Sequence, residues 1–226
     1  MTTTRATQAE RASRRATPRP IDVAAAIVLA GASGGAIVAH TYLPVAMKYT
    51  APFVVLPGAA LLAGVALAWR KRYGAVAILT DRFVAGALWG AVATVVYDVI
   101  RPAMVAAFNF DTNPYAAMPV FGSLITGRPA DAAIAQTIGW VYHAWNGVSF
   151  GVMFALVVPR GGWRQGLAWG LTLEGIMLAV YPGFLGAPVA TTAFVVVGVT
   201  GHAAWGATLG AGLRRFGRGA GGSRVA

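Results

Sequence analysis

The chain has 226 residues, of which 57% are hydrophobic and 11% are charged, and its mean hydropathy is +0.64. Soluble domains carry about 25% charged residues, so this composition excludes an ordinary soluble fold and predicts a protein that lies in a lipid bilayer. The net charge of +11 would favour nucleic acid in a soluble protein. Here the basic residues stand between and beside apolar runs, as in membrane proteins, and no nucleic-acid partner is expected.

The N-terminal residues 1–20 are polar and basic, without apolar periodicity, and are expected to form a disordered cytoplasmic tail. Arg14 and Arg15 form a twin-arginine pair, but the apolar residues that should follow such a signal are missing. Ala30-Gly31-Ala32 would suit a signal-peptide cleavage site. Against cleavage, the chain stays uncharged from residue 23 to residue 47, which predicts a retained span. The sequence leaves both interpretations open.

Apolar runs of the length needed to cross a bilayer recur along the whole chain. About 20 residues cross the ~30 Å hydrocarbon core as a helix. We therefore predict an all-α bundle of six transmembrane helices in residues 21–213, followed by a basic, glycine-rich tail at 214–226. The predicted spans are 21–43, 51–69, 83–106, 135–159, 166–181 and 189–213.

Two segments between the spans are expected at the membrane surface. Residues 74–79 are too short to cross and are expected at the interface. Residues 107–136 form the longest segment outside the spans. Their middle, 115–125, is apolar enough to lie on the membrane as a lid or to dip into it as a re-entrant segment.

The distribution of basic residues predicts the orientation of this bundle. With both termini in the cytoplasm, the segments on that side hold fifteen of the 18 Lys and Arg residues, leaving only Lys48, Arg101 and Arg128 elsewhere. Such a bias indicates the cytoplasmic side. The Ala-, Gly- and Arg-rich composition indicates a bacterial gene, so a multi-pass protein of the bacterial plasma membrane is expected.

Glycines spaced four apart predict close helix packing, either within the chain or between copies in a homo-oligomer, because small residues let helix backbones approach. The pairs are Gly86 and Gly90, Gly147 and Gly151, Gly166 and Gly170, and Gly206 and Gly210. A histidine precedes two of these pairs by four residues. His143 and His202 lie 59 residues apart in matching patterns, which indicates an internal repeat or a coincidence in a glycine-rich chain.

Ionisable groups within a span are costly, so each marks a candidate site. Asp98 and Arg101 share a helix face three residues apart, beside Tyr97, and are expected to form an ion pair. The pair would be either a structural lock or one wall of an outward-open cavity. His143 and Asn146, with Tyr142 beside them, would bind a ligand or a proton, or would only link neighbouring helices.

Glu174 is the most isolated charge, and burial disfavours its ionised form. We expect it either to carry protons or to bond a facing His or Tyr as a structural group. His202, in the last span, would be a satisfied buried histidine.

The sequence leaves the cofactor open. His143 and His202 could ligate haem between two helices, although their depths in the membrane differ. A metal site from His40, His143 and Asp98 is a weaker alternative, because no paired-histidine or Glu-x-x-His motif supports it. No metal site is therefore predicted.

Three functions remain. The first is a small transporter or complex subunit whose outward-facing site holds Asp98, Arg101, His143 and Asn146, with Glu174 coupling protons. The second is a membrane-embedded enzyme acting on a lipid or isoprenoid. Glu174 or Asp98 would be its catalytic acid, and an apolar pocket would be shaped by Trp140, Trp145 and Trp205. The third is a haem- or quinone-binding electron-transfer subunit. Phosphate-binding loops and nucleophile elbows are absent from the sequence.

Overall fold

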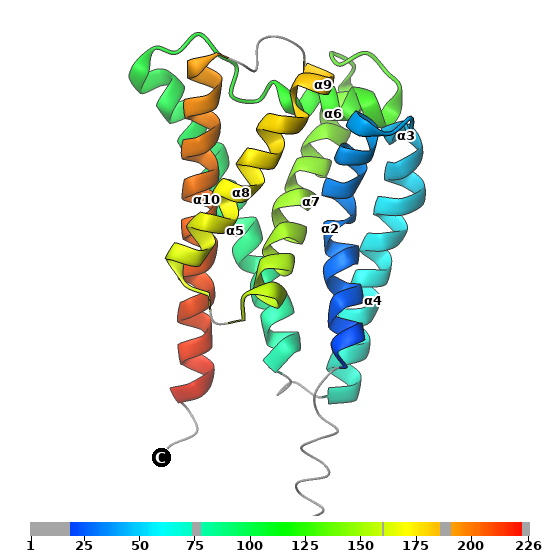
Figure 1. The fold of residues 1–226 in the computed structure, drawn as a ribbon, viewed down its shortest axis with the longest axis vertical. Coiled ribbons are helices and arrows are strands. Elements are labelled where there is room, and N and C mark those ends of the chain that lie inside the picture. Colours follow the sequence, from blue (N-terminus) through cyan, green and yellow to red (C-terminus); the bar gives the residue numbers. More distant parts are fainter. Residues whose placement is uncertain (1–18, 74–77, 160, 186–190, 223–226) are drawn as a thin grey trace, which may run out of the picture.

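A computed structural model describes residues 19–73, 78–159, 161–185 and 191–222, and this part of the chain is all-α (Figure 1). The long helices lie along the bundle, and shorter ones gather at one end. In chain order the elements are α2 (Pro20–Tyr42), α3 (Met47–Thr50), the π-helical turn η1 (Ala51–Val55), α4 (Leu56–Tyr73), α5 (Ile78–Phe108), α6 (Ala117–Thr126), α7 (Ala133–Val157), α8 (Trp163–Val180), α9 (Pro182–Leu185) and α10 (Thr192–Gly222).

Within the described residues, four helical stretches are long and apolar enough to cross a membrane: Pro20–Tyr42, Met47–Lys71, Asp81–Phe108 and Thr192–Arg215. The chain thus has the character of a multi-pass membrane protein. Helices α7 and α8 do not meet the same hydropathy criterion, although spans were expected at 135–159 and 166–181. Polar side chains such as His143 and Glu174 lower their hydropathy. Inside a bundle such side chains face other helices rather than lipid.

The second expected span, 51–69, is not one regular helix. Its first five residues form the π-helical turn η1, which follows α3, and the rest belong to α4. Pro52 lies in η1 and Pro57 at the start of α4, and neither can donate a backbone hydrogen bond. Such residues locally distort a helix, which explains the irregular start.

The two segments that were expected at the membrane surface, 74–79 and 107–136, are partly helical in the structure. Residues 74–77 lie outside the described part, but Ile78 and Leu79 already belong to α5. Helix α6 forms within 107–136 and packs against the first turns of α7. A left-handed Gly127 (φ 68°) ends it, a conformation that glycine adopts without cost.

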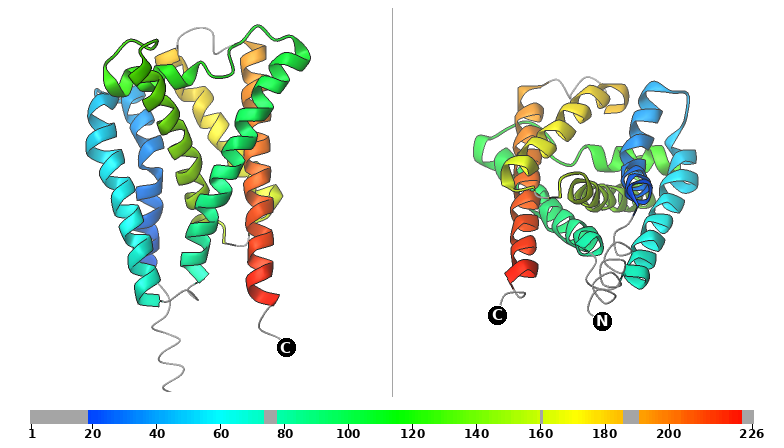
Figure 2. Two further views of the ribbon diagram at one scale, coloured as in Figure 1. Left: turned by 180° about the vertical axis from the view of Figure 1, so that it is seen from behind. Right: turned by 60° about the horizontal axis from the view of Figure 1, so that its bottom comes forward.

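The long helices alternate in direction (Figures 1 and 2). The starts of α2, α5 and α8 lie at one end with the ends of α4, α7 and α10, whereas α3, α6 and α9 lie at the other end. Helix α7 contacts α2, α5 and α6, while α10 lies between α5 and α8. Basic residues of the described part gather at the first end, notably Arg70, Lys71, Arg164, Arg214 and Arg215.

The four predicted glycine pairs join neighbouring helices of the same chain. Gly90 of α5 faces the carbonyl of Gly147 on α7, and Gly166 of α8 faces the carbonyl of Gly206 on α10. A Cβ at these glycines would press on the partner helix, on its backbone in most cases and on the Thr94 side chain at Gly147. The glycine faces are therefore buried inside the bundle, which is the first of the two alternatives that the sequence left open.

Candidate functional site

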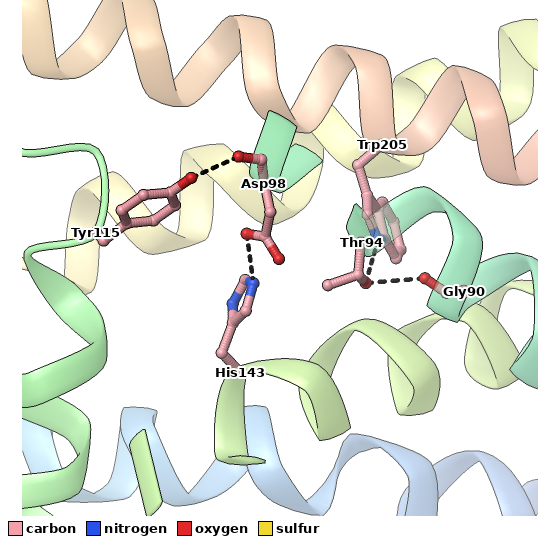
Figure 3. A network of polar contacts seen from close by, with 6 residues as sticks. All are labelled: Gly90, Thr94, Asp98, Tyr115, His143 and Trp205. Carbon is pink, nitrogen blue, oxygen red and sulfur yellow. Dashed lines mark hydrogen bonds and ion pairs between the residues drawn. The ribbon is translucent and has the colours of Figure 1, made fainter. Parts of the chain in front are cut away.

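Asp98 of α5 pairs with His143 of α7. The Nε2 atom of His143 lies 2.9 Å from Oδ1 of Asp98, at the distance where an imidazole N–H donates to a carboxylate (Figure 3). The prediction that Asp98 forms an ion pair with Arg101 is wrong. Arg101 instead folds over the ring of Tyr97, with its Cζ 4.6 Å from the ring centroid. The spacing of Asp98 and Arg101 along α5 allows them to pair but does not require it, and His143 on the neighbouring helix α7 binds the carboxylate instead.

A proline fixes the surroundings of this first acid–histidine pair. Pro102 has no N–H, so it cannot donate to the backbone carbonyl of Asp98 four residues earlier. That carbonyl accepts a hydrogen bond from the Tyr115 hydroxyl instead, at 2.7 Å (Figure 3). Tyr115 precedes α6 and packs on Trp140, which packs on His143. The segment between α5 and α7 is thus anchored over the pair.

Glu174 of α8 forms a second acid–histidine pair with His202 of α10. Oε2 of Glu174 lies 2.7 Å from Nδ1 of His202, and the Glu174 side chain is 3% exposed. The same Nδ1 lies 3.2 Å from the carbonyl of Gly198. The Glu174 oxygens lack a partner in hydrogen-bonding geometry, so the contact with His202 is electrostatic. A side chain at Gly198 would occupy the space of the carboxylate, so glycine is needed there.

The two acid–histidine pairs occupy equivalent places in two similar helix pairs, which we call the first unit (α5 and α7) and the second unit (α8 and α10). Gly151 packs on the backbone of Gly86 and Gly90, just as Gly210 packs on the backbone of Gly162 and Gly166. These contacts fix the correspondence of the two units. In the second helix of each unit, Gly139, His143, Ala144, Gly147 and Gly151 correspond to Gly198, His202, Ala203, Gly206 and Gly210.

The correspondence extends to the acids. Glycines 86 and 90 match 162 and 166, and the same step of 76 residues takes Asp98 to Glu174. The repeat indicated by the histidines therefore includes their acidic partners. Sequence reasoning missed this part because it compared only the two helices that carry the histidines. The glycine at 162, which precedes α8, was the missing signal.

Tyr97 lies between the two pairs. Its ring centroid is 5.7 Å from that of His143 and 4.9 Å from that of His202. The same step of 76 residues takes Tyr97 to Leu173 and Arg101 to Met177. One unit thus supplies Tyr97, which lines the cavity, and Arg101 packed on it, where the other unit supplies two apolar side chains that line the cavity.

A cavity of about 60 Å³ lies among these residues. This is room for a few water-sized groups. Asn146 lines the cavity, and its Oδ1 is buried without a hydrogen-bond partner in the described structure. Trp205 Nε1 donates to Thr94 Oγ1 at 3.2 Å, and Thr94 donates to the Gly90 carbonyl (Figure 3). The lining residues are Thr94, Tyr97, Phe121, His143, Asn146, Gly147, Phe150, Leu173, Met177, Tyr181, His202 and Trp205.

An apolar cleft of about 320 Å³ between α2, α7 and α8 shares the side chains of Phe150, Leu173 and Met177 with the cavity. These three residues form a wall between the polar cavity and the cleft. Gly35 of α2 lines the cleft and has open space where a Cβ would be. The cleft therefore has room for an apolar chain directly beside the polar site.

Several candidates from the sequence lie elsewhere. The Tyr142 hydroxyl donates to the Ser33 carbonyl of α2, and its ring lines a separate apolar groove of about 420 Å³. Trp145 lines that groove, and the Trp140 ring packs at a tilt against the Tyr115 ring. Of the three tryptophans expected around a pocket, Trp205 alone lines the cavity. Sequence reasoning missed Thr94 and Phe121, which carry no charge to single them out.

The geometry gives no support to haem between His143 and His202. Each imidazole already faces a carboxylate, and the Tyr97 ring lies between them. The cavity is also small beside the ~300–1,000 Å³ of ordinary ligand sites. The alternative metal site is not assembled, since His40 faces the Val45 carbonyl. Across the described ranges, no three His, Cys, Asp or Glu residues are grouped to hold a metal ion.

Comparison with known proteins adds no relative. No protein-family model matches the chain, and no curated protein or solved structure is detectably similar to it.

Proposed function

We propose that the protein is a small proton-coupled transporter of the bacterial plasma membrane, with six transmembrane helices and both termini in the cytoplasm. The observation that carries the proposal is the presence of two equivalent acid–histidine pairs whose histidines both line one cavity. Transporters built from repeats place their sites where the repeats meet. Helices α5 and α10, which contact each other across the two units, meet beside this cavity.

The charges of the site favour the uptake of a proton. Asp98 and Glu174 are two acids, while Arg101 is the single permanent cation buried beside them in the described core. With both histidines neutral and both acids ionised, the group has a net charge of −1. Uncompensated charge inside a membrane protein is costly. A proton on either pair removes it, so protonation and the binding of a charged solute are coupled.

Access to the cavity is expected from the end that holds α3, α6 and α9, which the basic-residue bias assigns to the outside. Phe121 of α6 and Tyr181, just after α8, line the cavity near this end. Tyr115 ties the α5–α6 connection to α5. Movement of this connection would open the cavity outward, as lids do in other proteins.

The test measures proton movement in proteoliposomes with a pH-sensitive dye inside. When small organic solutes are added outside in turn, the wild-type protein is expected to acidify the lumen with at least one of them. Glu174→Gln should lower that rate about tenfold or more, because Gln cannot carry a proton through the second pair. Glu10→Gln makes the same chemical change in the N-terminal tail and should leave the rate unchanged.

Two outcomes contradict the proposal. One is that no solute moves protons with the wild-type protein. The other is that Glu174→Gln, inserted in equal amount, moves them as fast as the wild type does.

A second candidate is a membrane-embedded enzyme that uses one of these acids on a lipid or isoprenoid. The apolar cleft behind Phe150, Leu173 and Met177 favours it, because an apolar substrate could lie there next to the acids. Purified protein that converts an isoprenoid lipid, and loses turnover in both Asp98→Asn and Glu174→Gln, would establish this function instead.

A further inference from the structure

Resting on the proposed transport function, we propose that the substrate is a single-chain amphiphilic carboxylate, whose head lies in the polar cavity and whose chain lies in the apolar cleft. The proposal follows from a buried arginine with two unpaired nitrogen atoms, an asymmetry between the two units, and a shared wall between cavity and cleft.

Arg101 is a buried cation with unused hydrogen-bonding capacity. It is 6% exposed, and its Nε and Nη1 atoms have no hydrogen-bond partner among the described residues. Burying such donors unpaired is costly. Its guanidinium lies on Tyr97, which lines the cavity, and it interacts electrostatically with Tyr181, another lining residue. A small group with only acceptor atoms and a negative charge would satisfy it, and a carboxylate has these properties.

The opposite wall cannot bind a second charge. The residues equivalent to Tyr97 and Arg101 in the second unit are Leu173 and Met177, which face both the cavity and the cleft. A ligand charged at both ends would leave one end against apolar side chains, at a considerable cost. A ligand with one charged and one apolar end would match both walls.

The cleft sets the size of the apolar part. Its volume of about 320 Å³ is at the lower end of ligand pockets, which span ~300–1,000 Å³. This is suited to one chain rather than to the two chains of a phospholipid. Phe150, Leu173 and Met177 separate head site and cleft, so the chain would reach the cleft by displacing one of these flexible contacts.

Every titratable or charged group near the head site influences binding. These groups are Tyr97, Asp98 and Arg101 on α5, Tyr115 before α6, His143 on α7, Glu174 and Tyr181 at α8, and His202 on α10. Because the acids and Arg101 leave one negative charge uncompensated, a bound carboxylate adds a second. Binding should therefore take up protons on the histidine pairs and should strengthen as the pH falls.

The test is photo-crosslinking in phosphatidylcholine nanodiscs with a dodecanoic acid that carries a diazirine near the end of its chain. Crosslinks are expected on cleft residues such as Val38 and Ile176, and dodecanoate should displace the probe whereas dodecyltrimethylammonium should not. Arg101→Gln should raise the dodecanoate concentration needed to displace the probe about tenfold or more. Arg101→Lys, which keeps the positive charge, should raise it less. Gly35→Leu fills the cleft and should abolish crosslinking there, while Gly64→Leu, also in open space but on α4, should not.

Three results would overturn the proposal. Equal crosslinking by an uncharged dodecanol analogue would mean that ordinary bilayer lipid fills the cleft. Displacement by acetate as strong as by dodecanoate would mean a small anion without a chain. Unchanged binding in Gly35→Leu would place the chain elsewhere. Solute-driven proton flux without dodecanoate binding would be a fourth such result and would leave the proposed function in place. Dodecanoate binding without any proton movement would instead contradict the proposed transport and leave only the binding site.

Discussion

At the scale of single residues, this protein stabilises polar groups inside an apolar bundle by giving most of them a partner on another helix. Asp98 illustrates the principle, because its carboxylate faces His143 and its backbone carbonyl, released by Pro102, accepts from Tyr115. In a membrane interior a free carbonyl has no water to bond. The proline and the tyrosine are therefore expected to depend on each other.

This dependence predicts a result for Tyr115→Phe. The substitution leaves the Asp98 carbonyl without its donor and should cost about 1–3 kcal/mol of unfolding free energy. In a Pro102→Ala background the restored N–H bonds that carbonyl, so the same substitution should cost clearly less. The measurement is unfolding in mixed micelles, with the exposed Tyr49→Phe as control. Equal costs in both backgrounds would disprove the link.

At the scale of helices, glycines decide which helices touch. Each unit is an antiparallel pair whose backbones meet at glycines, so the acid on one helix lies opposite the histidine on the other. Close approach of this kind replaces the hydrophobic driving force, which is weak between helices in lipid. The site is therefore a consequence of the packing.

Glycine-to-alanine substitutions should destabilise the protein where two helices touch at the glycine, and should stabilise it where the glycine faces open space. Gly90→Ala would place its Cβ 2.6 Å from the Gly147 carbonyl oxygen, and separating the helices should cost about 1–3 kcal/mol. At Gly64 a Cβ meets nothing within 4 Å, so Gly64→Ala should stabilise α4 by about 0.5–1 kcal/mol through helix propensity. Thermal unfolding in detergent measures both, and a stable Gly90→Ala protein would contradict the packing account.

At the scale of the whole molecule, the question is whether α7 and α8 cross the membrane. They lie among helices that are apolar enough to span, yet their own polar residues place them below the hydropathy criterion. Alternating direction through the bundle, with basic residues at one end, is the arrangement in which both helices cross (Figure 2).

Because the chain contains no cysteine, single cysteines can report this topology directly. Arg128→Cys, before α7, should react with a membrane-impermeant maleimide in intact cells. Arg164→Cys, at the start of α8, should react only after lysis. Labelling of both from outside would mean that α7 does not cross, and the six-span proposal would fail.

Local features of the sequence were enough to predict that the chain is helical, approximately where its long helices lie, and which glycines pack. These properties follow from local rules: hydrocarbon length fixes the span, and backbone hydrogen bonds must close within a helix. The sequence also singled out Tyr97, Asp98, Arg101, His143, Asn146, Glu174 and His202, which lie together around the site, since charged and polar groups are rare in spans.

How these residues pair depends on the packing of the helices and could not be predicted from the sequence. A helix that is apolar on all sides carries no periodic signal for which face turns inward, so its rotation depends on its neighbours. Because of that rotation, Asp98 pairs with His143 instead of Arg101, and the Tyr142 hydroxyl donates to the Ser33 carbonyl. Two nitrogen atoms of Arg101 are left without a hydrogen-bond partner. The alignment of the first unit with the second unit also depends on these contacts. The spacing of the glycines within each helix allows two alignments, whereas the contacts between the helices allow only one.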